Sequence, residues 1–152
     1  MSRERGYRFA VDHGAPAAAR EATERELQDI EWGPKLTAGL LAGALVATCI
    51  RGEGGVVHVV VAVKPDLIRV EVTGSGHGFR LPLSSRAIDY LCIGDEEARP
   101  VGWRSYLLDQ LAERWGVDER NGLAWFEVDH ASAEARRLIS GRKRAVRTRR
   151  VA

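Results

Sequence analysis

The pattern of hydrophobic and polar positions alternates in some stretches and recurs at helical spacing in others, which predicts a mixture of strands and helices. The expected elements are, in chain order, strand Arg5–Val11, helix Ala17–Glu31, helix Leu36–Ile50, strand Val56–Val63, strand Leu67–Val72, helix Ser105–Val117 and strand Leu123–Val128. The first strand is short and mixed, with Tyr7, Phe9 and Val11 at alternate positions, as is typical of an edge strand. Strands grouped with helices in this order predict an α+β fold, a two-layer α/β sandwich with the helices on one face.

The two N-terminal helices differ in character. The first is amphipathic, and the Trp32–Pro34 stretch is expected to end it. The second, Leu36–Ile50, is apolar on every face, which is typical of a helix in the middle of a fold. Its 15 uncharged residues fall short of the roughly 20 that a membrane span requires. Its small residues, Gly39 and Gly43 among them, should let it lie close to a neighbouring element.

The valine-rich run Val56–Val63 and the alternating stretch after it are separated by Lys64-Pro65-Asp66, a tight-turn sequence. Valine favours strands, so the two stretches should form a β-hairpin. In the second strand one face holds Ile68, Val70 and Val72, and the other holds Arg69, Glu71 and Thr73.

The C-terminal half of the body begins with a long irregular connection over residues 74–101, and such connections are usually functional or mobile. The next helix has a leucine stripe that ends at Trp115, and Gly116 is a natural helix stop. A turn over residues 118–122 then leads into the last strand, where Ala124, Phe126 and Val128 share one face.

Charge divides the chain into two parts. Residues 131–152 contain eight of the 23 basic residues and one of the 21 acidic residues, which leaves residues 1–130 with a net negative charge. We therefore expect one domain over residues 1–130 and a basic C-terminal tail over 131–152, partly helical or disordered. A stretch from Ala133 to Ile139 could continue as a helix.

Cysteine and histidine usage excludes the usual metal and redox motifs. Cys49 and Cys92 have no metal-site or redox spacing, and the four histidines are too scattered to suggest zinc. No catalytic residue and no metal ligand is therefore assigned. A reduced, cytoplasmic setting is expected, because no secretory signal is visible and no membrane association is predicted.

The stretch Leu67–Phe126 contains an ordered series of motifs. A strand ends in the glycine-rich turn Thr73–Phe79, and a polar loop follows. The sequence then continues into "LAERWGV" and closes with "WFEV". This order resembles the ATP-binding domain of the GHKL superfamily, and most closely its anti-sigma-factor serine kinases, over about residues 7–129. The resemblance implies a GHKL (Bergerat, histidine kinase-like) ATPase fold with a mixed, mostly antiparallel sheet.

The resemblance also implies where a nucleotide would be held, and most of the required groups are replaced here. Gly76, Gly78 and Gly102 match the family's phosphate-loop glycines, although simple turn geometry also explains glycine there. The replaced positions are Ala44 for the catalytic Glu, Thr48 for the magnesium-binding Asn, Gly74 for the adenine-reading Asp, Arg104 for a glycine and Leu123 for the adenine Thr. We therefore expect a degenerate ATP site, with Gly76, Gly78 and Gly102 as residual and non-functional nucleotide-loop positions and no cofactor.

The resulting hypothesis is a non-catalytic transcription regulator of the anti-sigma-factor type that binds a protein partner. The family's partners are sigma factors and STAS-domain antagonists, and a homodimer is possible. One alternative is a working ATP- and magnesium-dependent serine/threonine kinase with an unusual site, so whether the protein is an enzyme stays open, with a non-enzymatic role favoured. The second is a nucleic-acid-associated regulator that uses the basic tail. The apolar residues within Arg80–Pro100, the family's lid position, are expected to form a protein contact surface or to cover the empty pocket.

Overall fold

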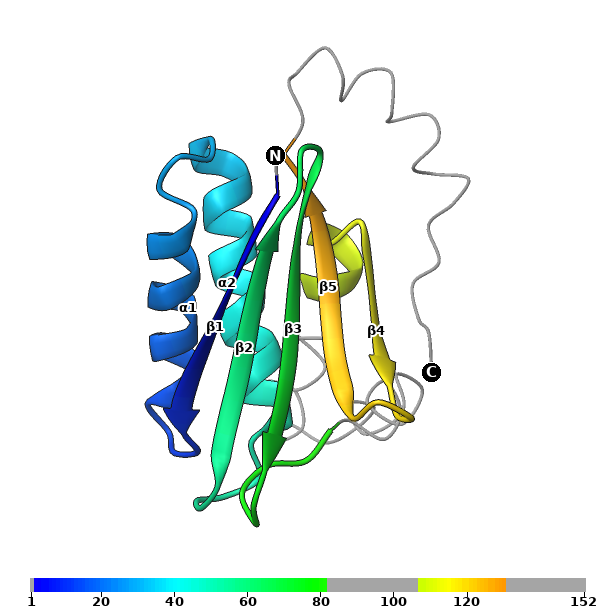
Figure 1. Cartoon of the computed structure of the whole chain (residues 1–152). Helices are drawn as coiled ribbons and strands as arrows, with labels where there is room; N and C mark the ends of the chain where they lie inside the picture. Colours follow the sequence, from blue (N-terminus) through cyan, green and yellow to red (C-terminus); the bar gives the residue numbers. More distant parts are fainter. Residues whose placement is uncertain (1, 82–106, 131–152) are drawn as a thin grey trace.

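The computed structural model describes residues 2–81 and 107–130, which form two layers (Figure 1). The elements are β1 Arg3–Ala10, α1 Ala15–Glu26, α2 Trp32–Cys49, β2 Val56–Val63, β3 Leu67–Ser75, β4 Arg114–Asp118 and β5 Leu123–Asp129. A short helical stretch at 107–111 precedes β4. The five strands form one open sheet, and the helices lie behind it in the view of Figure 1. The α+β class and the two-layer sandwich are thus confirmed.

The strands are ordered β1-β2-β3-β5-β4, and each neighbouring pair is antiparallel. β1 lies at one edge of this sheet, as its sequence predicted, and β4 lies at the other. The hairpin of β2 and β3 is also confirmed, and Lys64 N donates to Leu67 O at 2.8 Å to close its turn.

The predicted faces of β3 are confirmed by burial. Ile68, Val70 and Val72 are fully buried beneath the helices, and the residues between them are only half-buried. β2 repeats the pattern, with Val57, Val59 and Val61 fully buried. Since each buried aliphatic side chain contributes about 1.5–3 kcal/mol of transfer free energy, this face is the main source of cohesion between the layers.

The boundary between the two helices differs from the prediction. α1 ends at Glu26, not at residue 31, and its last turn is closed by Leu27 N, which donates to Thr23 O. Trp32 begins α2, although the Trp32–Pro34 stretch was expected to end the preceding helix. Proline is tolerated in a first helical turn, where a backbone N–H has no partner within the helix. The same three residues therefore suit a helix start as well as a stop.

The close packing of α1 on α2 depends on two glycines of α2, as predicted. A Cβ added at Gly43 would lie 3.1 Å from Pro16 O, and one at Gly39 would lie 2.6 Å from Glu24 Cγ. A side chain at Gly43 would press on the backbone of α1, whereas one at Gly39 would displace the Glu24 side chain. Within the described residues, no helix is long and apolar enough to cross a membrane.

The predicted helix Ser105–Val117 is wrong over its second half. Residues 107–111 are helical, but Arg114–Asp118 forms β4 and pairs with β5. Trp115 and Val117 enter the core from this strand, and Gly116 lies mid-strand opposite Trp125, so it does not end a helix. The change of structure occurs over two residues: Ala112 N still donates to Leu108 O, whereas Glu113 N donates to Glu127 O at 2.7 Å. From Arg114 onward, backbone hydrogen bonds to β5 replace the hydrogen bonds within a helix.

Three other predictions fall outside the described residues. These concern the lid segment beyond Leu81, the positions Gly102 and Arg104, and the tail over 131–152.

Candidate functional site

Most of the residues that the sequence assigns to a nucleotide site gather where α2 ends. Two loops meet there, a first glycine loop over Arg51–Gly55 and a second glycine loop over Gly76–Arg80. Gly78 N donates to Gly54 O at 2.8 Å, and Arg51 N donates to Gly78 O at 2.8 Å. Arg80 N donates to Cys49 O at 2.8 Å, which fixes the second loop to the last residue of α2. The two loops therefore bond to each other and to the helix end.

The glycines of the second loop are required by the contact between the loops. Gly76 has φ +93°, a conformation that favours glycine, and a Cβ added to it would lie 2.4 Å from Gly55 Cα. A Cβ at Gly78 would lie 2.7 Å from Val11 Cγ1 and 2.8 Å from the Glu53 carbonyl carbon. Packing alone thus accounts for glycine at both positions. The Gly78 N–H, which would face a phosphate in a nucleotide loop, donates within the protein.

Gly74 is covered by an aromatic ring. A Cβ built on Gly74 would lie 2.4 Å from Phe79 Cδ2 and 2.5 Å from Phe79 Cγ. The ring stays in place partly because residue 79 forms an antiparallel bridge with Ile50, just after α2. Phe79 therefore fills the space in which any side chain at position 74 would begin, and position 74 is the one that the sequence analysis assigned to adenine reading.

On α2, the two positions assigned to catalysis and magnesium carry neither a carboxylate nor an amide. Thr48 is 3% exposed, and its hydroxyl donates to Ala44 O, four residues earlier, at 2.8 Å. Ala44 has no polar side-chain atom. The next residue, Cys49, is fully buried, and burial raises the pKa of its thiol to about 12 even though nearby Arg51 acts in the opposite direction. This thiol is therefore neutral and unreactive at physiological pH.

Leu123 does not face these residues. It is the first residue of β5 and is paired with Asp118 of β4. Its neighbour Ala124 is fully buried against the helices, so Leu123 lies on the opposite face of the sheet. The structure thus brings Gly74, Gly76 and Gly78 to the end of α2, but it does not bring Leu123 there.

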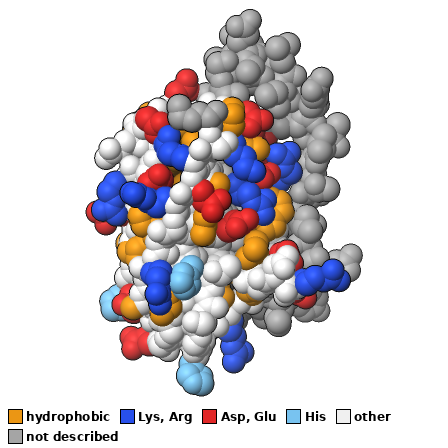
Figure 2. Space-filling model, in the orientation of Figure 1, with side chains coloured by type: hydrophobic (Ala, Val, Ile, Leu, Met, Phe, Trp, Pro, Cys, Tyr) orange, Lys and Arg blue, Asp and Glu red, His pale blue; other side chains and the backbone are white. Residues whose placement is uncertain are grey.

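The open face of the sheet carries a polar network that the sequence analysis missed. Glu127 accepts from Arg114 at 2.7 Å and from Arg69 at 3.1 Å, and Arg69 also donates to Glu71 at 2.8 Å. The Arg69 guanidinium lies 4.3 Å from the centre of the Trp125 ring, and Trp125 itself is only 9% exposed. Figure 2 shows this face, with charges of both signs among hydrophobic side chains. Alternation of charged residues along β3 was the available signal.

Burial of Glu127 favours its neutral form, but the hydrogen bonds and charges of Arg114 and Arg69 outweigh this effect. The net result is that the pKa of Glu127 lies below its usual value. The carboxylate is therefore charged under physiological conditions and holds three neighbouring strands together.

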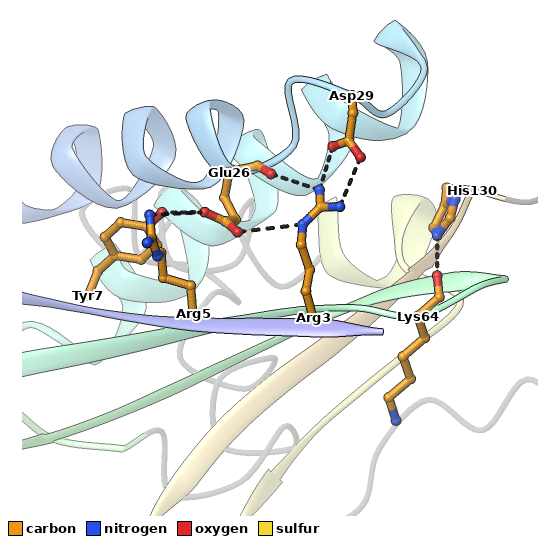
Figure 3. A network of polar contacts seen from close by, with 7 residues as sticks. All are labelled: Arg3, Arg5, Tyr7, Glu26, Asp29, Lys64 and His130. Carbon is orange, nitrogen blue, oxygen red and sulfur yellow. Dashed lines mark hydrogen bonds and ion pairs between the residues drawn. The ribbon is translucent and has the colours of Figure 1, made fainter. Parts of the chain in front are cut away.

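A second polar cluster joins β1 to α1 (Figure 3). Arg3 donates to both carboxylate oxygens of Asp29 and to Glu26 O, and the Tyr7 hydroxyl donates to Glu26 Oε2 at 2.8 Å. Burial and the Glu26 carboxylate both raise the pKa of Tyr7. On the other side of the same view, His130 Nε2 lies 2.5 Å from Lys64 O and joins the end of β5 to the β2–β3 turn. Both sets of contacts hold elements together, and neither resembles a catalytic arrangement.

In the part of the chain described here, no three His, Cys, Asp or Glu side chains gather in a way that could hold a metal ion. Comparison with known proteins finds no protein-family model that matches the chain and no curated protein with significant similarity to it.

Proposed function

We propose that this protein is a GHKL-type regulator related to anti-sigma factors, which acts by binding a protein partner and does not use ATP. The two-layer fold supports the proposal, as do the glycine turn after β3 and the "LAERWGV" and "WFEV" stretches, which follow one another in the order that the resemblance implies. The partner class is a sigma factor or a STAS-domain antagonist.

The observation that carries the proposal is the internal closure of the second glycine loop. A nucleotide loop must present free N–H groups to phosphates. Here Gly78 N already bonds to Gly54 O, and the Phe79 ring already covers Gly74. A nucleotide would have to break the first contact and displace the second before it gained any interaction of its own.

The missing adenine acceptor adds to that cost. A hydrogen bond to a charged group contributes about 1.5–3 kcal/mol, and an unpaired buried amine costs a similar amount. The loss at Gly74 alone therefore weakens ATP binding on the order of a hundredfold. Since Ala44 and Thr48 also lack the groups for base and metal chemistry, the kinase alternative has no residue on α2 to carry it.

The nucleotide half of the proposal is tested by isothermal titration calorimetry with ATP and magnesium. We expect no saturable heat of ATP binding at ATP concentrations up to about a millimolar, a range that would detect even weak specific binding. Saturable binding tighter than about 100 µM, or phosphate transfer to a purified partner, would refute this half and favour the kinase alternative.

The partner half is tested with purified sigma factors and STAS-domain proteins encoded by the same genome. We expect one of them to bind without nucleotide and with an affinity that added ATP does not change. If none binds, or if binding requires ATP, the proposed function is wrong even where the calorimetry shows no nucleotide affinity.

A further inference from the structure

The turn between β4 and β5, residues 119–122, contains the one asparagine of the whole sequence, Asn121, and a glycine follows it directly (Figure 1). Asparagine is a thermolabile residue, because the backbone nitrogen of the next residue can attack its side-chain amide. A glycine in the next position makes this attack easiest, since it has no Cβ to crowd the nitrogen. The Asn121–Gly122 pair is therefore a candidate site of spontaneous covalent modification.

The structure leaves both reacting groups accessible. Asn121 is exposed, Gly122 is half-buried, and nothing lies within 4 Å of a Cβ added to Gly122. Gly122 N donates a hydrogen bond to no other described residue, and the pairing of β4 with β5 begins only at Leu123. The attacking nitrogen is thus not held in the ladder between the two strands.

Asp118, the last residue of β4, holds the amide before it reacts. Its Oδ2 accepts from Asn121 Nδ2 at 2.7 Å, and its Oδ1 accepts from Asn121 N at 3.1 Å. These hydrogen bonds hold the pKa of Asp118 below its usual value, so its carboxylate is charged at neutral pH. Both features slow the attack, because the bonds restrain the side chain that Gly122 N must reach and the negative charge opposes the loss of that nitrogen's proton.

We propose that Asn121 is a site of spontaneous deamidation in the folded protein and that Asp118 is a positioning residue that sets its rate. Gly122 N loses its proton and bonds to Asn121 Cγ, which closes a succinimide ring. The bond between Cγ and Nδ2 breaks, and Nδ2 leaves as ammonia with the proton that Gly122 N lost. Water then opens the ring at either carbonyl, which gives aspartate or isoaspartate at position 121. Water is the only other reactant, and the reaction is independent of the proposed function.

The products change the hairpin in which they form. A carboxylate at position 121 replaces the amide that donates to Asp118, so an attraction becomes a repulsion between like charges. Isoaspartate also adds a carbon to the backbone of the turn just before Leu123, which pairs with Asp118. Among the described strands, β4 is an edge strand of five residues that pairs only with β5. We therefore expect the modified protein to unfold at a lower urea concentration than the unmodified protein.

The test is prolonged incubation of the full chain at mildly alkaline pH, with peptide mass spectrometry of samples taken over time. We expect Asn121 to be converted in the folded protein, at a rate that rises about tenfold per pH unit as the attacking nitrogen is deprotonated. The exposed amides of Gln28 and Gln110 are internal controls and should stay intact while most of Asn121 reacts. Gly122→Ala should slow the conversion, because its Cβ crowds the nitrogen.

Replacing Asp118 by Ala tests the positioning role. Asp118→Ala should speed the conversion of Asn121 about fivefold in the folded protein, the factor that corresponds to one hydrogen bond of typical net strength. In urea, where the contact is absent, the variant and the wild type should react at nearly the same rate. Asp118→Asn keeps an acceptor oxygen without the charge, so its rate should lie between those of the wild type and Asp118→Ala.

The matched control is Glu119→Ala, which removes an exposed carboxylate from the same turn and leaves both hydrogen bonds to Asn121 in place. Its rate of conversion should equal that of the wild type, and circular dichroism of each variant verifies that it is folded. An Asn121 side chain that stays intact in the folded wild type at alkaline pH would overturn the proposed site. An Asp118→Ala variant that reacts no faster than Glu119→Ala would overturn the role of Asp118.

Discussion

Replacing Gly74 by Ala tests directly whether the Phe79 ring packs tightly on Gly74 near the end of α2. The new Cβ would lie 2.4 to 2.7 Å from three ring carbons of Phe79, whereas ordinary contact begins at about 3.4 Å. The ring would have to move by about 1 Å, and overpacking of this kind typically costs about 1–3 kcal/mol. We therefore expect Gly74→Ala to lower the free energy of unfolding by about 2 kcal/mol.

The assay is urea unfolding followed by tryptophan fluorescence, with Gly33→Ala as the matched control. Nothing lies within 4 Å of a Cβ added at Gly33 in the first turn of α2, so that variant should be neutral or slightly stabilising. Both variants replace glycine by alanine, and only one of them meets the ring.

A double-mutant cycle tests whether the Phe79 ring causes the loss of stability in Gly74→Ala. In a Phe79→Ala background the new methyl group meets no ring, so the cost of Gly74→Ala should fall by about 1 kcal/mol or more. If Gly74→Ala is as stable as Gly33→Ala, or if its cost is unchanged without the ring, the packing account of Gly74 is wrong.

The remaining predictions concern two buried or partly buried groups. The pKa of Glu127 is lowered in the folded protein, so its stabilising contribution is present above the unfolded pKa near 4.5 and is lost as pH falls through the folded pKa. Glu127→Gln should therefore destabilise by about 1 kcal/mol at neutral pH and show a weaker loss of stability on acidification, measured by urea unfolding from neutral to acidic pH. Burial raises the pKa of Cys49 to about 12, so its thiol should react slowly with a thiol reagent in the folded protein and rapidly in urea. The Cys92→Ser variant leaves Cys49 as the one cysteine to be measured. Equal reaction rates in the folded and unfolded states would contradict the burial of Cys49.

The sequence predicted the structure correctly where a hydrophobic pattern fits only one kind of secondary structure. The alternation in β3 assigned Ile68, Val70 and Val72 to the core, because a period of two has no helical counterpart over six residues. The valine-rich run before it left few alternatives to a strand. The hairpin and the edge position of β1 followed from these local signals together with the turn sequence.

The failures occurred where one residue fits two patterns. Trp115 continues the helical stripe of Leu108 and Leu111, and it also begins the strand alternation that Val117 continues. Only pairing with β5 decides between them, and pairing is not local information. The Trp32–Pro34 stretch fails for a similar reason, because proline both ends and begins helices.

The candidate site shows a different limit. Sequence order located Gly76 and Gly78 and also suggested turn geometry as a sufficient reason for them. It could not identify Gly54 and Gly55 as the surfaces against which they pack, since these lie more than twenty residues away in the chain. It also could not place a ring on Gly74, although Phe79 is only five residues later.

These contacts also bear on the proposal that the protein does not use ATP. A single Gly74→Asp change would supply the adenine acceptor but would force its own Cβ into the Phe79 ring. Removing the ring would still leave Gly78 N bonded to Gly54 O, and α2 would still lack a carboxylate and an amide at positions 44 and 48. Each of these changes alone would cost stability or supply only part of a nucleotide site, so we expect none of them to confer ATP binding. Under the proposed function, regulation would come from the abundance of protein partners or from competition between them.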